Sequence, residues 1–265
     1  MKRILIFVLF LISSLSTAVW ALDDVRCDEL LPKGLEFTKN CQAVKTKLNF
    51  WAGPTTFAAN GLLNAVVTMP VGTNVQWLVD VQTGVLKADT SSNTGPVVVL
   101  GPSVAVPTVV SEKGKCKEHQ EDEGKPAVVP PNLINYLGQV ANYGIVPHTI
   151  GNDLKPLDIL ILGTPMLRGS VKTVKLIGAI QFTSVDGFVV NKLLAVLPGT
   201  FLGDNVNNLE DLDTKANGVK SILQTWLENA NGVGALTNPV FLDVGTPSDG
   251  GLSGTAYGVL NDSIF

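Results

Sequence analysis

The chain has few of the residues from which several common kinds of site are built. It contains two histidines, His119 and His148, and three cysteines, none of which lies in a C-x-x-C pair or at zinc-ligand spacing. We therefore expect no histidine-rich metal centre, no zinc site and no histidine-based catalytic triad. The formal net charge is −4, and no basic stripe is present. This charge balance argues against a nucleic-acid partner.

Long apolar runs are also scarce after the N-terminus. Residues 1–21, MKRILIFVLFLISSLSTAVWA, join two basic residues to a run of about ten apolar residues and to small residues before Ala21, which is the pattern of a signal peptide. The run is shorter than the roughly 20 residues of a membrane-spanning helix, and no later segment qualifies as a membrane anchor. We expect the leader to be removed with Lys2 and Arg3, which changes the formal charge from −4 to −6, and the protein to be exported to the periplasm or the extracellular space.

The three cysteines predict one disulfide if the protein is exported. Cys27 and Cys41 lie in the same N-terminal segment, so their pairing is favoured. Cys116 lies in the charged loop KGKCKEHQEDEG and is expected to face solvent, where a free thiol is able to form an intermolecular bond.

The apolar content of 45% supports one domain with a sizeable core. We divide the chain into the leader at 1–21, an N-terminal extension at 22–52 and a domain at 53–265. That domain is interrupted at about 90–131 by a Ser/Gly/Pro-rich, Val-rich and then charged segment, which we interpret as an insertion.

Short β-type runs alternate with turn residues along this domain. The predicted strands are LLNAVVTMP, VQWLVD and VLKAD around a QTG turn, LDILILG, VKTVKLIGAIQFTS, FVVNKLLAVLP and PVFLDVG. Apolar residues from Val219 to Leu227 recur at helical spacing, and the C-terminal tail predicts a weak helix. The fold class is therefore mainly β (α+β), a small closed OB-like β-barrel with one or two flanking helices.

The order of the segments NYGIVPHT, DLKPLD, LDILIL, RGS, VKLIGAI and KLLAV resembles the soluble inorganic pyrophosphatases of the single-domain, magnesium-dependent type. The likeness runs from about Gly53 to Val244. It implies a small barrel whose cavity holds several Mg²⁺ ions and a diphosphate, which a metal-bound hydroxide cleaves to two phosphates. It also implies a homo-oligomer.

The resemblance assigns roles to individual residues. The family pattern D-x-D-P-x-D is written DLKPLD, so that Asp153 and Asp158 match metal ligands, while Lys155 occupies the position of the acid expected to act as base. Tyr143 and Lys192 match substrate-binding positions. The other polar positions of the pattern are replaced by Thr68, Gln76, Leu78, Thr90, Gln139, Ser184, Val190, Ala230 and Asn231.

Two interpretations of the remaining acids are open. Asp153 and Asp158 bind one cation, with Asp186 from a neighbouring turn, or Asp153 neutralises Lys155 while Asp158 accepts backbone hydrogen bonds; the second is favoured. Lys192 either contacts phosphate or pairs with Asp158, and the pair is favoured.

Two functions follow from these observations. The replaced residues favour an exported pseudoenzyme, a binding or structural module that recognises a neutral ligand or, through the 90–131 insertion, a protein partner. The alternative, which family resemblance alone favours, is an active or weakly active diphosphatase with a rebuilt Mg²⁺ site.

Overall fold

The computed structural model describes residues 29–39, 41–90, 132–134, 136–245 and 254–264. The leader at 1–21, Cys27, Cys116 and almost all of the 90–131 insertion lie outside the described residues, so their predictions stay predictions. Cys41 is disulfide-bonded, which confirms that a disulfide forms. Because the two other cysteines both lie outside the described residues, the pairing with Cys27 also stays a prediction.

The described residues form ten strands, four α-helices and one short 3-10 helix, η1. In chain order the elements are β1 (Glu36–Phe37), β2 (Val44–Lys45), η1 (Ala59–Gly61), β3 (Leu63–Met69), β4 (Trp77–Val79), β5 (Leu86–Ala88), β6 (Asn142–Ile145), β7 (Asp158–Leu162), β8 (Val171–Ser184), β9 (Val189–Val196), α1 (Phe201–Asn205), α2 (Leu209–Lys215), α3 (Val219–Asn229), β10 (Leu236–Asp243) and α4 (Ala256–Ser263).

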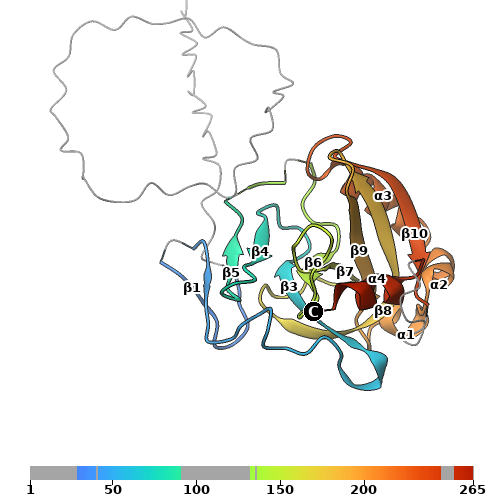
Figure 1. The fold of residues 1–265 in the computed structure, drawn as a ribbon. Helices are drawn as coiled ribbons and strands as arrows, with labels where there is room; N and C mark the ends of the chain where they lie inside the picture. Colours follow the sequence, from blue (N-terminus) through green and yellow to red (C-terminus); the bar gives the residue numbers. More distant parts are fainter. Residues whose placement is uncertain (1–28, 40, 91–131, 135, 246–253, 265) are drawn as a thin grey trace, which may run out of the picture.

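Five strands pair in a closed ring. The order is β8–β3–β6–β7–β9, and β9 pairs again with β8, while β10 is added to the outer side of β8. The pairing of β7 with β9 is parallel and the other pairings of the ring are antiparallel. The 14 residues of β8 are long enough to pair with β3, β9 and β10 (Figure 1). The mainly β fold predicted from the short apolar runs is confirmed.

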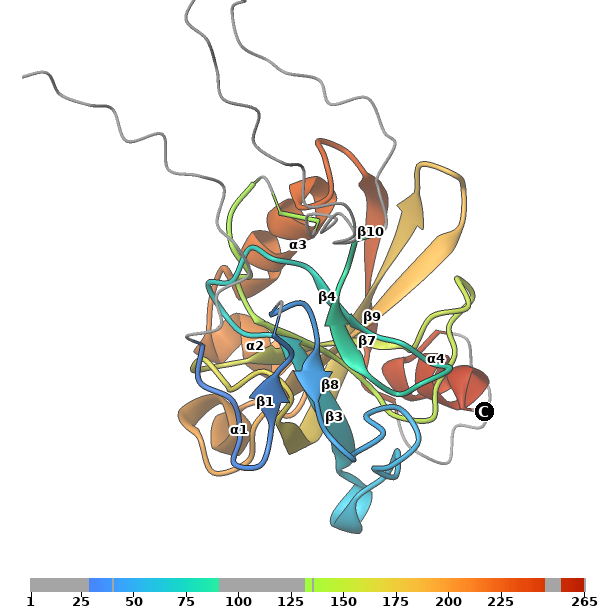
Figure 2. The ribbon, with the colours of Figure 1, turned by 90° about the vertical axis from the view of Figure 1, so that its left-hand side faces the viewer.

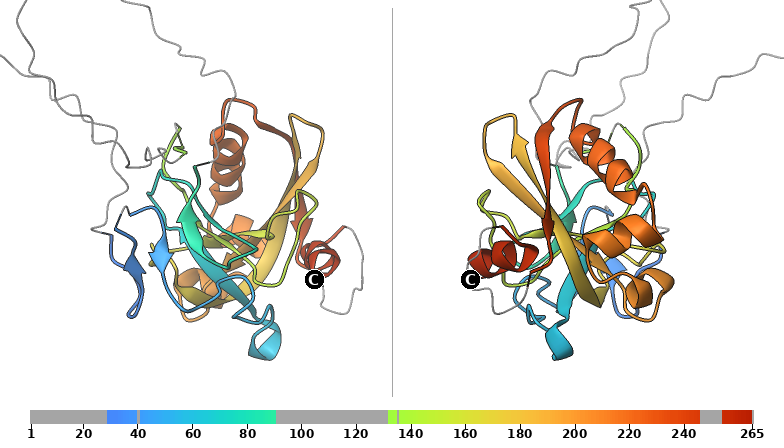
Figure 3. Two further views of the ribbon diagram at one scale, coloured as in Figure 1. Left: turned by 60° about the vertical axis from the view of Figure 1, so that its left-hand side comes forward. Right: turned by 90° about the vertical axis from the view of Figure 1, so that its right-hand side faces the viewer.

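The helices cover the sheet from two sides. Helices α1, α2 and α3 lie on one side and α4 lies on the other, as two views of the ribbon show (Figures 2 and 3). Four α-helices are described where one or two were predicted, because the chain between Phe201 and Asn229 is divided. Thr200 and Asn208 cap α1 and α2 through their side chains, and Gly218 precedes α3 in a left-handed conformation with φ of 86°. None of the helices in the described ranges has the length and apolar character of a membrane span.

The N-terminal extension packs onto the domain. Val44 and Phe50 are buried in one apolar cluster with β3, β4 and β5. The amide of Ala88 donates to the carbonyl of Gln42, and Ala43 bridges Lys87 in an antiparallel arrangement. The predicted hairpin around the QTG turn is confirmed as the antiparallel pair β4–β5. Residues before Gly53 are therefore part of the core that supports this side of the ring.

Candidate functional site

The turn between β6 and β7 contains the acids that the sequence singled out. Backbone bonds close it: the Gly151 amide donates to the Lys155 carbonyl over 2.7 Å, and the Leu154 amide donates to the Gly151 carbonyl over 3.0 Å. Asp153 Oδ1 accepts the backbone N–H of Lys155 over 3.2 Å. The side chains of Asp153 and Lys155 are both exposed. Asp153 therefore stabilises the turn, as Asp side chains often do in loops.

Asp158 begins β7 and forms a cluster with Lys192 and Tyr143. In the parallel register of β7 and β9, Asp158 lies opposite Lys192. Lys192 Nζ lies 2.7 Å from Asp158 Oδ2 and 2.7 Å from the hydroxyl oxygen of Tyr143, whose hydroxyl donates to the same carboxylate. The favoured ion pair of Lys192 with Asp158 is confirmed. The expected backbone hydrogen bonds to Asp158 are replaced by these two side-chain bonds.

The cluster is largely shielded from water. Lys192 is 6% exposed, and its ammonium also lies 5.0 Å from the centre of the Tyr143 ring. Burial raises the pKa of Tyr143 well above its usual value, and the charge of Asp158 and the hydrogen bond to it raise the pKa further. Tyr143 is therefore a neutral donor. One carboxylate and one ammonium neutralise each other inside this cluster.

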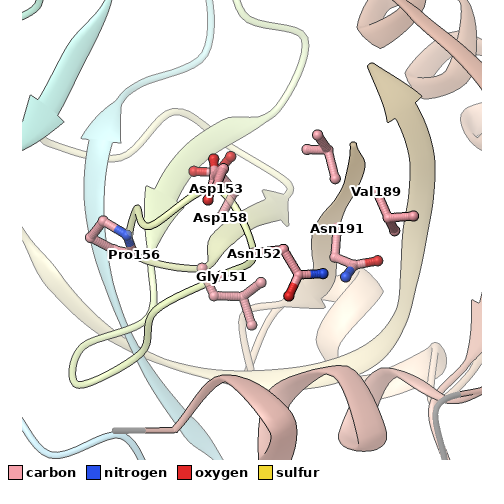
Figure 4. Close-up of a pocket in the computed structure, with 9 residues that line it drawn as sticks. Gly151, Asn152, Asp153, Pro156, Asp158, Val189 and Asn191 are labelled. Carbon is pink, nitrogen blue, oxygen red and sulfur yellow. The ribbon is translucent and has the colours of Figure 1, made fainter. Parts of the chain in front are cut away.

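A small pocket lies beside the acid turn. Asp153 and Asp158 both line it, together with Asn152, Val190 and Asn191, and its volume is about 20 Å³ (Figure 4). A cavity of this size has room for about one water molecule. Asp186 does not line this pocket; it is exposed in the turn between β8 and β9. The structure thus brings two of the three predicted metal ligands to one pocket, and not the third.

The donor set does not fit the metal cluster that the resemblance implies. Within the described ranges, no three Asp, Glu, His or Cys side chains gather at a possible metal position. Asp158 is already bonded to an ammonium, and Asp153 Oδ1 accepts a backbone amide. Mg²⁺ prefers a nearly octahedral set of oxygen ligands from carboxylates, substrate and water. At this pocket the described residues offer two carboxylates, Asp153 and Asp158, and the charge of Asp158 is neutralised by Lys192.

A second and larger cavity is lined by Tyr143 and Lys192 of the cluster, and we call it the amide pocket. Its volume is about 80 Å³, and its polar lining consists of Gln76, Gln139, Tyr143, Lys192 and Asn231. Gln139 is 2% exposed, and its Oε1 atom has no hydrogen-bond partner among the described residues. Gln76 Nε2 donates to Asn231 Oδ1 over 3.0 Å. Gln76, Gln139 and Asn231 each replace a polar residue of the family pattern, and all three line this one cavity.

The rest of the amide pocket is apolar. Met69, Trp226 and Leu236 line it, as does Ala230, another replaced position. Trp226 is 3% exposed and its indole N–H donates to the Leu137 carbonyl over 2.9 Å, so the prediction that it belongs to the core is confirmed. The same ring also forms part of a cavity wall, which helical spacing alone did not indicate.

Other replaced positions are occupied by side chains with structural contacts. Thr68 is buried at the end of β3, and its hydroxyl donates to the Tyr143 carbonyl over 3.2 Å. Ser184 Oγ accepts the Phe188 amide over 3.1 Å in the turn between β8 and β9. In both contacts the hydroxyl group bonds to the backbone, so neither contact indicates a role in binding a metal or a phosphate.

Arg168 is a buried cation that the sequence analysis did not single out. It is 2% exposed, lies 4.4 Å from the centre of the Trp77 ring and forms a 2.9 Å ion pair with Glu29. Its guanidinium also donates to the carbonyl of Thr68. Burial lowers the pKa of Arg168, while the charge of Glu29 opposes that shift. No local sequence pattern indicated its burial, because its partners Glu29 and Trp77 are distant in the chain.

Comparisons with known proteins agree on one family. The family model described as inorganic pyrophosphatase matches residues 104–234. An inorganic pyrophosphatase of Agrobacterium fabrum is 43% identical over 100 residues, which are 36% of this chain and 55% of that relative. One from Rickettsia bellii is 30% identical over 117 residues, 44% of this chain and 66% of the relative. The chain thus spans between about half and two thirds of the length of these curated relatives.

Solved structures show the same fold. A type I inorganic pyrophosphatase from P falciparum covers 78% of this chain and 65% of its own length, with a TM-score of 0.56 and 17% identity. An inorganic pyrophosphatase from Schistosoma japonicum covers 76% of this chain and 69% of its own, with a TM-score of 0.54 and 18% identity. The order of strands, the matched positions around the acid turn and these likenesses lead to one conclusion: the chain belongs to the soluble inorganic pyrophosphatase family.

Proposed function

We propose that this chain is an exported member of the family that does not hydrolyse diphosphate and that serves as a binding or structural module. The observation behind the proposal is the cluster of Lys192, Asp158 and Tyr143. There, the acid that the resemblance assigns to metal binding has an ammonium at 2.7 Å. A divalent cation at Asp158 would share that carboxylate with the ammonium of Lys192, and the two positive charges would repel each other in this partly buried cluster.

Diphosphate hydrolysis also needs a base and positive charge around the substrate. Lys155 occupies the position of the expected base, and an ammonium has no lone pair that accepts a proton from water. The polyanionic substrate is normally neutralised by metal ions and cationic side chains. In the amide pocket the cation is Lys192, whose charge Asp158 already neutralises, and the other polar lining groups are neutral. These features support a cavity that takes something other than diphosphate.

Family membership supports a second function, an active or weakly active inorganic diphosphatase with a rebuilt Mg²⁺ site. One structural observation favours it, since Asp153 and Asp158 line the same pocket. In this second function Asp153 and Asp158 would bind a single cation, and diphosphate would be the substrate.

Phosphate release from diphosphate separates the two functions. The native protein would be assayed with Mg²⁺, Mn²⁺, Co²⁺ or Zn²⁺, beside a blank with metal and diphosphate alone. We expect release at the rate of the blank with every metal, because Lys155 occupies the position of the base and the described residues gather no set of metal ligands. A native turnover on the order of one per second or faster, abolished in Asp158→Asn, would establish the diphosphatase and refute the pseudoenzyme.

Two variants at one position provide the matched control. Lys155→Asp restores the central acid of the pattern, and Lys155→Gln removes the charge without adding an acid. We expect both to remain at the rate of the blank, because Asp158 still pairs with Lys192. Calorimetric titration of Mg²⁺ should likewise detect no binding at millimolar concentration.

The rest of the proposal concerns location and partners. The leader at 1–21 supports export to the periplasm or the extracellular space, and the insertion at 90–131 is proposed as the contact with a protein partner. A homo-oligomer is proposed from the family resemblance alone.

A further inference from the structure

The amide pocket contains a buried polar atom that has no hydrogen-bond partner among the described residues. Gln139 is 2% exposed, and its amide nitrogen lies 3.5 Å from the Met69 sulfur, which is a weak acceptor. Its Oε1 atom accepts no hydrogen bond from the described residues. A buried carbonyl oxygen left unsatisfied costs about 1–3 kcal/mol, so it favours any molecule that brings a donor to it.

The charge of the lining disfavours ions. An anion would meet the unpaired carbonyl oxygen of Gln139, and the positive charge of Lys192 is neutralised by Asp158 at 2.7 Å. A cation would find no carboxylate in the lining, because Asp158 does not line this pocket. A neutral ligand meets neither penalty.

The rim supplies both kinds of hydrogen-bonding group. The bond from Gln76 Nε2 to Asn231 Oδ1 uses one donor and one acceptor, which leaves Gln76 Oε1 as an acceptor and Asn231 Nδ2 as a donor. Asn231 is exposed, so the pocket opens to solvent at this side. Met69 and Trp226 present apolar surface within the same cavity. The lining therefore combines an acceptor in the interior, a mixed rim and an apolar wall.

We propose that the amide pocket binds a small neutral primary carboxamide, or the carboxamide end of a larger molecule, whose N–H donates to Gln139 Oε1 while its alkyl part contacts Met69 and Trp226. The inference rests on the proposed function, because a pocket that processes diphosphate would need a cationic lining. The volume of about 80 Å³ limits the buried part to a few heavy atoms. A cavity of roughly 150 Å³ holds benzene.

The test uses propionamide as the probe and the full-length protein. Ligand-observed NMR titration would compare propionamide with two molecules of similar size: propionate, which is an anion, and methyl acetate, which has a carbonyl but no N–H donor. A ligand of this size is expected to bind with a dissociation constant on the order of millimolar. We expect propionamide to bind more tightly than both analogues.

Gln139→Leu is the decisive variant. Losing the hydrogen bond should weaken propionamide binding about threefold to tenfold and leave methyl acetate nearly unchanged. Folding does not confound the result, since removing an unsatisfied buried amide should leave the midpoint of urea denaturation unchanged or raised. Gln181→Leu is the matched control, because Gln181 bonds Asn191 on the β8–β9 hairpin, and neither residue lines the amide pocket.

Three results would overturn the inference. The first is no propionamide binding up to about 0.1 M, which is far above the expected dissociation constant. The second is propionate binding as tightly as propionamide, and the third is unchanged propionamide binding in Gln139→Leu. The native protein could release phosphate from diphosphate and still bind propionamide through Gln139. That result would refute the proposed function and support the inference, so failure of the proposed function is distinguishable from failure of the inference.

Discussion

The ammonium of Lys192 neutralises the carboxylate of Asp158, so the positive charge beside this acid comes from the chain itself. Its side chain is 8% exposed and that of Asp158 is 25% exposed, so their attraction is screened less than that of a surface pair. Strand register determines the contact, because β7 and β9 run parallel with the two residues opposite each other. Tyr143 then donates to the same oxygen from β6.

Removing one residue of this ion pair should lower the free energy of unfolding more than removing both residues. Lys192→Met leaves a partly buried carboxylate without its ammonium, and we expect the free energy of unfolding to fall by about 2–4 kcal/mol. The double variant Asp158→Asn/Lys192→Met should recover at least half of that loss. Urea denaturation at neutral pH measures both. Equal stabilities of the single and double variants would contradict a coupled pair.

Tyr143 should lose its proton late in an alkaline titration. Its pKa is raised well above the usual value of about 10, first by burial and then by Asp158. The unfolded chain therefore releases this proton at a lower pH than the folded one. The stabilisation is complete below pH of about 10 and decreases as the pH rises toward the folded-state pKa.

Tyrosinate absorbance followed against pH measures this directly. The latest component of the native titration should be absent from Tyr143→Phe. Tyr257→Phe is the comparison, because burial also raises the pKa of Tyr257, although by less. A late component that persists in Tyr143→Phe would show that Tyr143 is not the strongly shifted group.

At the scale of single elements, close backbone approach restricts β6. Gly144 lies between Tyr143 and Ile145, and a Cβ atom there would be 2.3 Å from the Val66 carbonyl oxygen on β3. Any side chain at this position would separate two strands of the ring. It would also displace the neighbouring Tyr143 from its carboxylate.

Gly144→Ala should therefore lower the free energy of unfolding by about 1–3 kcal/mol. Gly254→Ala is the matched control, since a Cβ atom at that glycine would have nothing within 4 Å. Thermal unfolding followed by circular dichroism compares the two. A Gly144→Ala protein as stable as the Gly254→Ala protein would mean that β3 and β6 move apart without cost.

Local sequence patterns were sufficient for most strands of the six-stranded sheet, and insufficient for the division of the helices and for some of the site. Turn residues and apolar alternation predict β7, β8 and β9, and helical spacing predicts α3 from Val219. The position of Asp186 was not predictable, because the long β8–β9 hairpin places its turn away from the acid pocket. Arg168 was missed for a related reason: its partners Glu29 and Trp77 are distant in the chain, so no local pattern indicates its burial.

At the scale of the whole molecule, the N-terminal segment is tied to the domain by several kinds of contact. Glu29 pairs with Arg168, Phe50 is fully buried beside β5, and Cys41 is disulfide-bonded. A disulfide that closes a loop limits the freedom of the unfolded chain and stabilises the folded one by about 2–4 kcal/mol.

Peptide mapping without reduction should find Cys41 linked to Cys27 and Cys116 as a free thiol. The reason is that Cys27 and Cys41 lie in one short segment, whereas Cys116 lies in a charged loop far along the chain. Alkylation of the native protein should label Cys116 alone. A linked peptide that contains Cys41 and Cys116 would refute the pairing. Reduction should lower the thermal midpoint of the native protein.

The closed ring has a consequence for self-association. A strand with one free edge is a template on which another chain can add a strand, and closure removes such edges. In the described part of the six-stranded sheet, β10 alone has a neighbour on one side only. That strand contains Pro239 and a register shift between Thr237 and Val240, both of which interrupt a regular row of donors and acceptors. Subunits of the proposed homo-oligomer should therefore meet through side chains, and not by extending the sheet from one copy to the next.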